Sequence, residues 1–147
     1  ANAFADHYRG GAWSLAAEGK SDLLALVGEL SVAPELGYTR TPAEEADPRL
    51  AGRGVLAHLA RLATTGPDSH DSDAAGTHAL LILDNVDDPG LLSAQQVGRL
   101  PSRDVVRVVA TTRLGADRLT HKGGLAFVPV DVLAPDDALE LIRWHQP

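Results

Sequence analysis

The order of apolar and polar positions divides the chain into strand-like and helix-like stretches. Four continuous apolar runs predict β-strands, and they span residues 12–17, 79–83, 105–110 and 125–130. Apolar residues at helical spacing predict helices, which we expect at residues 3–9, 23–30, 48–62, 91–100, 115–121 and 135–144. Because strands alternate with helices, the sequence predicts an α/β fold, a parallel sheet with helices on both faces.

Local signals place the starts of two of these helices. Ser21 is the expected N-cap of the first leucine-rich helix, because its hydroxyl can accept a hydrogen bond from an amide of the first turn. Asp47 is the expected N-cap of the next helix, with Pro48 at the first helical position. Residues 33–48 and 64–77 contain proline, glycine and small polar residues, and we predict that they are loops.

Composition restricts the class of protein. The chain has 147 residues, 44% hydrophobic and 22% charged, which is the size and balance of one globular domain. It has no cysteine, so disulfides and thiolate metal sites are excluded. Its net charge of −7 disfavours general binding to nucleic-acid phosphates. None of its apolar stretches is long enough to cross a membrane, so we expect no membrane partner.

The start of the chain bears on where the protein works. The chain begins at Ala1 and contains no methionine, so we expect it to be a processed product or a fragment of a longer protein. Its first residues lack the basic segment and apolar core of a secretory signal. Together with the absence of cysteine, this favours a cytoplasmic location.

The sharpest chemical signal is the segment LLILDNVDD, residues 80–88. Four apolar residues end a buried strand, and Asp84 follows them directly. Open α/β sheets bind ligands at the carboxyl ends of their strands. A carboxylate there can hold Mg²⁺ directly or through water, together with phosphate oxygens. The alternative is that Asp84 only begins a turn after a buried strand.

A second apolar run also ends in polar residues. The segment VVRVVATTR, residues 105–113, places Thr111, Thr112 and Arg113 after a buried strand. If this strand neighbours the one that carries Asp84, Arg113 projects toward the same crevice. The planar guanidinium matches two phosphate oxygens at once. The alternative is a surface arginine paired with a nearby carboxylate.

Taken in order, these segments resemble a known family. LLILDNVDD, then VVATTR, then VDVLAPDDALELI at residues 130–142 resemble the NB-ARC-type nucleotide-binding domain of the STAND signalling ATPases. The opening YRGGAWSLAAE, residues 8–18, is similar to the second-strand region of the same family. The resemblance covers nearly the whole chain. It implies that residues 1–147 form one partial nucleotide-binding domain with a P-loop NTPase-like fold, truncated at its N-terminus.

The resemblance implies a role for each polar residue at the two strand ends. Asp84 matches the Walker B aspartate that binds magnesium, and Arg113 matches the sensor arginine that touches the γ-phosphate. Thr111 and Thr112, which stand beside that arginine, are further candidates for nucleotide binding. The implied ligands are ATP or ADP with Mg²⁺.

Asn85 departs from the family pattern. Many members have a second acidic residue at this position, which orients or deprotonates the attacking water. An amide can hold a water molecule but cannot accept its proton, so we expect slow hydrolysis. Asp87 is the next candidate for a catalytic role, with Asp88 beside it, and the alternative for both is helix capping or exposure to solvent.

The phosphate loop G-x-x-x-x-G-K-[ST] is not found in the sequence. Gly19, Lys20 and Ser21 end like that motif, but Ser14 stands where its first glycine is required. Backbone amides must approach the phosphates closely, which glycine permits. We therefore expect Gly19 to Ser21 to form a turn, with a phosphate-loop role for Lys20 as the alternative.

The resemblance implies that the parent protein is an ATP/ADP-dependent signalling switch. In such a switch the bound nucleotide sets the arrangement of neighbouring domains, and slow hydrolysis resets it. Its expected partners are the nucleotide, other domains of the same chain and further copies of itself on activation, with no nucleic acid. We expect this chain alone to be inactive. The alternative is a non-catalytic α/β protein-interaction module without nucleotide chemistry.

Overall fold

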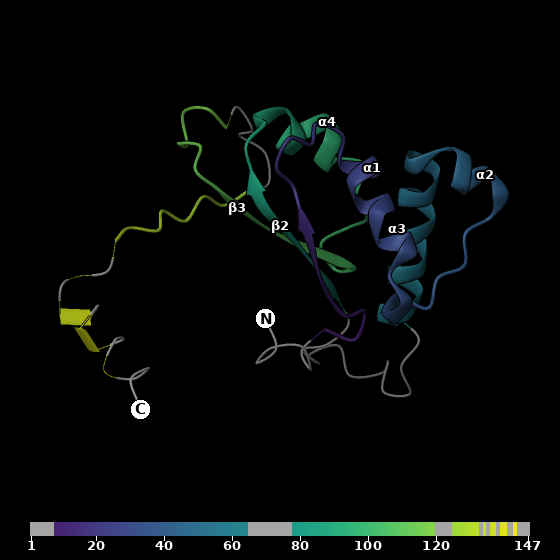
Figure 1. The fold of residues 1–147 in the computed structure, drawn as a ribbon, viewed down its shortest axis with the longest axis horizontal. Coiled ribbons are helices and arrows are strands. Elements are labelled where there is room, and N and C mark those ends of the chain that lie inside the picture. Colours follow the sequence, from purple (N-terminus) through teal and green to yellow (C-terminus); the bar gives the residue numbers. More distant parts are fainter. Residues whose placement is uncertain are drawn as a thin grey trace.

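The computed structural model of the chain describes residues 8–64, 78–119 and 125–132, together with residues 134, 136, 137, 139, 140 and 143. A three-stranded parallel sheet lies at its centre, in the order β1 (Ala12–Ala16), β2 (Ala79–Val86) and β3 (Val106–Thr112). Figure 1 shows the strands on one side and the helices α1 and α3 on the other. The predicted α/β class and parallel sheet are thus confirmed.

The helices and 3₁₀ helices connect the strands in chain order. Between β1 and β2 the chain forms α1, η2, η3, α2 and α3, and between β2 and β3 it forms η4 and α4. Their bounds are α1 (Leu23–Gly28), η2 (Glu29–Val32), η3 (Pro34–Leu36), α2 (Pro42–Ala46), α3 (Pro48–Thr64), η4 (Pro89–Leu92) and α4 (Ala94–Val97).

Strand register divides the sheet into two different faces. Leu15 pairs with Leu83, and Leu83 with Ala110, on the face that also carries the buried Leu81. On the opposite face, Ile82 is half-buried and its β3 partner Val109 is 52% exposed. Among the described residues the helices cover the leucine face, so the predicted cover on both faces is seen on one face only.

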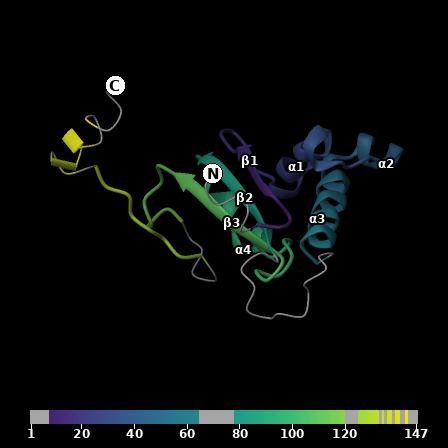
Figure 2. The same cartoon turned by 90° about the horizontal axis from the view of Figure 1, so that it is seen from below.

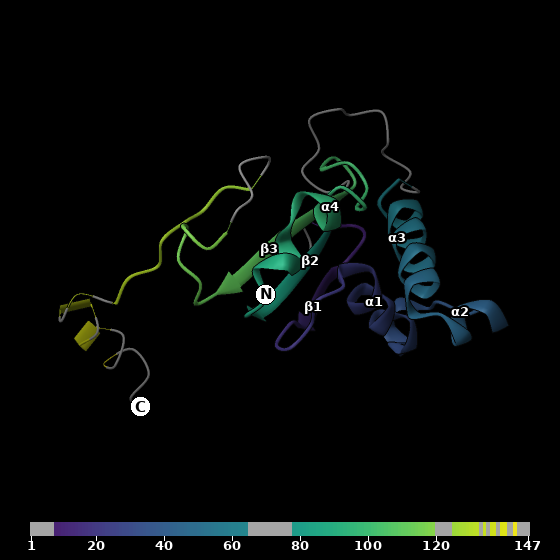
Figure 3. The ribbon, with the colours of Figure 1, turned by 90° about the horizontal axis from the view of Figure 1, so that it is seen from above.

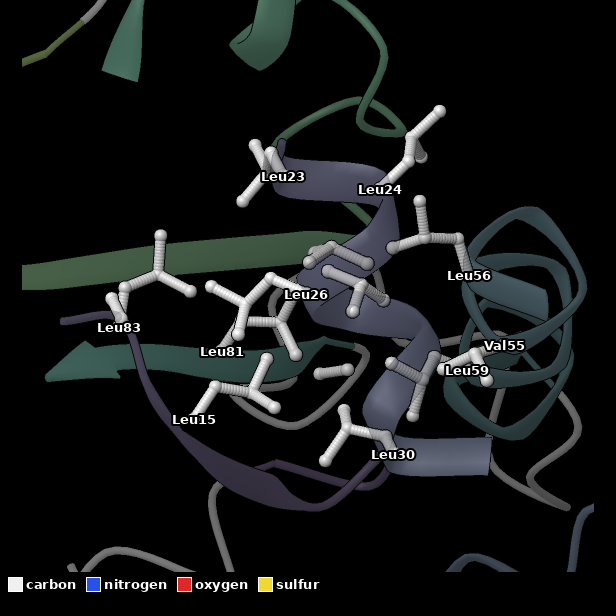
Figure 4. Packing of buried hydrophobic residues seen from close by; sticks show 14 of the residues in the cluster. Leu15, Leu23, Leu24, Leu26, Leu30, Val55, Leu56, Leu59, Leu81 and Leu83 are labelled. Carbon is white, nitrogen blue, oxygen red and sulfur yellow. The ribbon is translucent and has the colours of Figure 1, made fainter. Parts of the chain in front are cut away.

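A leucine-rich core joins the covered face of the sheet to α1 and α3. Figure 4 shows Leu81 and Leu83 of β2 pointing toward α1, and Val55 and Leu59 of α3 closing the core from the other side. Each of these four side chains is at most 1% exposed. Burial of one such side chain stabilises the fold by roughly 1.5–3 kcal/mol, so this core holds the sheet against the helix pair.

Two glycines let α1 and α3 approach closely. A Cβ atom added at Gly28 would collide with the carbonyl oxygen of Pro48, and one added at Gly52 would collide with the carbonyl oxygen of Leu24. Figures 2 and 3 show the two helices side by side. Gly52 weakens the helix intrinsically, but this contact is possible only without a side chain at that position.

Several local predictions were wrong in detail. The cap of α1 is Asp22 rather than Ser21, because its side chain accepts a hydrogen bond from the Ala25 amide. The helix predicted at 115–121 is a turn over its described residues. The helix predicted at 91–100 is shorter, consisting of η4 and the one-turn α4.

The strand predicted at 125–130 is also not formed. These residues adopt no regular secondary structure and are exposed. A strand requires a hydrogen-bonding neighbour, and this segment has none among the described strands. Of the helix predicted at 135–144, five residues are described as helical; they are Asp136, Asp137, Leu139, Glu140 and Arg143. Residues 3–7 of the helix predicted at 3–9 lie outside the described residues, and residues 8 and 9 are not helical.

Candidate functional site

The carboxyl edge of the sheet brings together the residues that the sequence singled out. Asp84 lies near the end of β2, and Arg113 directly follows β3, its parallel neighbour. Both side chains are exposed. The prediction that they share the carboxyl edge on neighbouring strands is therefore confirmed.

A bulge in β2 shapes this edge. Leu83 is opposite Ala110, but Val86 is opposite Thr112, so that Asp84 and Asn85 together face the single residue Thr111. Asn85 adopts the left-handed conformation with a φ of 60°, and it is the only non-glycine residue to do so among those described. Bulges of this kind redirect side chains at the ends of strands, and asparagine tolerates this conformation better than most residues.

The hydroxyl of Thr111 bonds to both residues of the bulge. It donates a 2.6 Å hydrogen bond to Oδ1 of Asp84 and accepts a 2.8 Å hydrogen bond from the backbone amide of Asn85. A hydroxyl-to-carboxylate distance of 2.6 Å is typical of a charge-assisted hydrogen bond. Oδ1 of Asp84 is thus held in place, while Oδ2 accepts no hydrogen bond from a described residue.

The hydroxyl of Thr112 closes the ends of the same two strands. It donates a 2.6 Å hydrogen bond to the carbonyl oxygen of Val86 and accepts a 3.0 Å hydrogen bond from the amide of Leu114. Both threonine hydroxyls are therefore engaged within the protein. Neither of these hydrogen bonds involves Arg113, which is an exposed residue in the bend after β3.

Asp87 and Asp88 contact loops instead of Asp84. Oδ1 of Asp87 accepts a 2.9 Å hydrogen bond from the amide of Gly19, which joins the loop after β2 to the loop after β1. Oδ1 of Asp88 accepts a 2.8 Å hydrogen bond from the amide of Gly90 and caps η4. The helix-capping alternative is thus observed for Asp88.

Lys20 forms part of a turn next to this edge. Its amide donates to the carbonyl oxygen of Ala17, and its Nζ forms a 2.6 Å ion pair with Glu29. Trp13 and Ser14, which a phosphate loop ending at Lys20 would include, belong to β1 instead. The expected turn is confirmed. Because the residues before this turn form β1, they do not form a glycine-rich phosphate loop around Lys20.

An ionic cluster fixes the start of α1 beside the site. The carboxylate of Asp22 lies 2.8 Å from Nε of Arg49 and 3.8 Å from Nη1 of Arg99. Burial raises the pKa of Asp22, but the Ala25 amide and the two guanidiniums lower it more, so the net pKa is below its ordinary value. The cluster ties α1 to α3 and to the turn after α4, and sequence reasoning missed it.

The oxygen atoms at this edge suit a hard cation only in part. Asp84 offers one carboxylate oxygen, and no group of three or more potential metal-ligating side chains occurs within the described part of the chain. Mg²⁺ binds through one or two carboxylates when phosphates and water complete its shell. Among the described residues, Asp84 therefore does not belong to a closed protein cage for a cation. Within the same described residues, no helix has the length and apolar character needed to cross a membrane.

Comparisons of the chain with protein-family models, with curated proteins and with solved structures found no match. They therefore add nothing to the resemblance that the sequence motifs carry.

Proposed function

We propose that this chain is part of the nucleotide-binding domain of an ATP/ADP-dependent switch of the STAND type. Asp84 would hold the Mg²⁺ of a bound nucleotide, and Arg113 would contact its terminal phosphate. The bound ion would neutralise phosphate charge and fix the phosphate groups. The observation that carries the proposal is the position of Asp84 and Arg113 at one carboxyl edge of a parallel sheet.

The bonding state of Asp84 supports its role. Thr111 donates a hydrogen bond to Oδ1 of Asp84, and Asp84 as a whole is exposed. A carboxylate that is oriented by a neighbour but not neutralised by a cation retains its charge for an incoming ion. None of the ion pairs described for the chain involves Asp84, so Asp84 is not the nearby carboxylate with which a surface Arg113 would pair.

The phosphate loop would approach from the free edge of β3. Among the described strands β3 pairs with β2 alone, so its other edge can accept a further parallel strand. Arg113 directly follows β3, and bound phosphates must reach both Arg113 and Asp84. In the parent protein we expect the strand that leads into the phosphate loop to pair there.

The proposal is tested by nucleotide binding to the parent protein. Calorimetry with Mg-ATP and with Mg-ADP is carried out on the parent and on its Arg113→Ala variant. Loss of a γ-phosphate contact should reduce the preference for ATP over ADP by roughly 10-fold, the effect of one charge-assisted hydrogen bond. Arg118→Ala, an exposed arginine of the following turn, is the matched control. Equal preference in the parent and in Arg113→Ala would remove the sensor role.

One observation favours the protein-interaction module as a second candidate. Val128, Val130 and Val132 are 75%, 93% and 88% exposed, and Val109 of β3 is also exposed. Exposed apolar side chains that recur along one segment are a feature of surfaces that bind protein. A parent protein that binds neither Mg-ATP nor Mg-ADP would favour this candidate over the switch.

A further inference from the structure

The hydroxyl of Thr111 takes part in the hydrogen bonding of the bulge between β2 and β3. At the bulge, the register moves by one residue between Leu83 and Val86, which separates the Asn85 amide from the regular β2–β3 ladder. That amide donates to Oγ1 of Thr111 at 2.8 Å. An amide without a hydrogen-bond acceptor costs free energy, and the Thr111 side chain supplies the acceptor for the Asn85 amide.

The same hydroxyl fixes Asp84. Oγ1 has one proton, and it donates this proton to Oδ1 of Asp84 at 2.6 Å. With its proton given to Asp84 and a lone pair engaged by Asn85, the hydroxyl connects the two residues of the bulge. Rotation of the Asp84 side chain would break this bond, so the hydroxyl holds the carboxylate in one orientation.

We infer that Thr111 is a positioning residue, which sets the orientation of the Asp84 carboxylate and the left-handed backbone of Asn85. Thr111 thereby acts through Asp84 and does not itself bind nucleotide. The consequence for cation binding rests on the function proposed above, whereas the positioning of the bulge does not. A residue that orients a metal ligand in this way typically changes metal affinity by roughly 10–100-fold when it is removed.

Thr112 provides a matched control within the same strand. Its hydroxyl also makes two hydrogen bonds, at 2.6 Å and 3.0 Å, but to Val86 and Leu114. Replacement of Thr112 by valine removes a comparable pair of bonds without touching Asp84 or Asn85. An effect that is specific to Thr111 therefore separates positioning from a general loss of strand stability.

The first experiment measures amide hydrogen exchange of Asn85 by NMR in the ¹⁵N-labelled chain, without nucleotide. Thr111→Val should accelerate exchange of the Asn85 amide by roughly fivefold or more, because its acceptor is lost. Thr111→Ser, which restores the hydroxyl, and Thr112→Val should leave it near the wild-type rate. Unchanged exchange in Thr111→Val would overturn the inference.

A measurement on the wild-type chain covers the case in which Thr111→Val does not fold. The hydroxyl proton of Thr111 should be protected from exchange and should show a nuclear Overhauser effect to the Asn85 amide. A freely exchanging hydroxyl at this position would contradict the proposed bonds.

The second experiment tests the consequence for the cation in the parent protein. Mn²⁺, added with ADP, should broaden the resonances around Asp84, and Thr111→Val should weaken this effect roughly 10-fold while Thr111→Ser preserves it. If Mn²⁺ with ADP leaves the wild-type resonances unchanged, the proposed nucleotide function fails, and the exchange data still decide the positioning role. Equal Mn²⁺ affinity in wild type and Thr111→Val would overturn the cation part of the inference.

Discussion

The backbone amide of Gly19 donates a 2.9 Å hydrogen bond to Oδ1 of Asp87, 68 residues further along the chain. This bond joins the loops that follow β1 and β2 at the carboxyl edge of the sheet. Gly19 has a φ of 69°, a backbone conformation that residues other than glycine rarely adopt. Asp87 therefore holds a loop beside the site and is not directed at Asp84.

Replacement of Asp87 should affect stability more than nucleotide chemistry. We expect Asp87→Ala to lower the free energy of unfolding by about 1 kcal/mol, the net value of one hydrogen bond. Urea unfolding of the chain measures this loss, with Asp104→Ala as an exposed control on the opposite edge. In the parent protein the rate of phosphate release should change little. A large fall in that rate with normal stability would restore Asp87 as a catalytic candidate.

Gly52 is required by the contact between α3 and the Leu24 carbonyl of α1. We expect Gly52→Ala to destabilise the chain by about 2 kcal/mol, because overpacking outweighs the better helix propensity of alanine. Thermal unfolding followed by circular dichroism provides the measurement. Arg53→Ala, at an exposed position of the same helix, is the control. A Gly52→Ala variant as stable as the wild type would show that α1 and α3 can move apart without loss of folding free energy.

Asp22 should make stability depend on pH in acid. Its folded pKa lies below the ordinary value of 3.8, so its ionised form contributes stability above pH 3.8. That contribution is lost as the pH falls through the lower, folded value. Asp22→Asn keeps an N-cap but no charge, and it should be less stable than wild type at pH 7 by roughly 0.5–1 kcal/mol. Urea midpoints at pH 7 and pH 3 should show this difference shrinking in acid; a constant difference would contradict the ionic role.

Asn85 adopts the left-handed backbone conformation, and its amide side chain cannot accept a proton from water. Aspartate and glycine both tolerate its φ of 60°, but only aspartate adds a group that can accept a proton from water. In the parent protein we expect Asn85→Asp to raise the steady-state rate of phosphate release by roughly 10-fold or more. Asn85→Gly, which keeps the backbone conformation, should not raise it. A rate that is unchanged or lower in Asn85→Asp would mean that another residue positions the water.

Most strands and the long helix could be predicted because their signals are local. The apolar runs at 79–83 and 105–110 and the periodic leucines of α3 depend on burial alone, which the sequence records directly. By contrast, α2 was missed although Thr41 and Glu44 form a capping box there. The prolines around this segment favoured a loop, whereas Pro42 stands at a first helical position, where proline is accommodated.

The candidate site could be predicted only in its outline. The position of Asp84 and Arg113 at one edge follows from two apolar runs that end in polar residues. The bulge could not be predicted, because it depends on how β2 and β3 align, which no local pattern records. For the same reason the hydrogen bonds of the Thr111 hydroxyl to Asp84 and Asn85 could not be predicted.

The segment at 125–130 has the sequence pattern of a strand but does not form one. Its apolar run satisfies the local criterion for a strand, and Phe127 is nevertheless 49% exposed. Strand formation there depends on a neighbouring strand that the described residues do not provide. A local pattern thus predicts the tendency to form a strand, and pairing decides whether the strand forms.

The central claim is that Asp84 binds the magnesium ion of a nucleotide. Calorimetric titration of the parent protein with Mg-ADP, in wild type, Asp84→Ala and Asp104→Ala, tests it most directly. We predict that Asp84→Ala weakens Mg-ADP binding by roughly 10-fold or more, that Asp104→Ala binds like wild type, and that the 147-residue chain alone binds weakly or not at all. Equal affinity of wild type and Asp84→Ala for Mg-ADP would contradict the account.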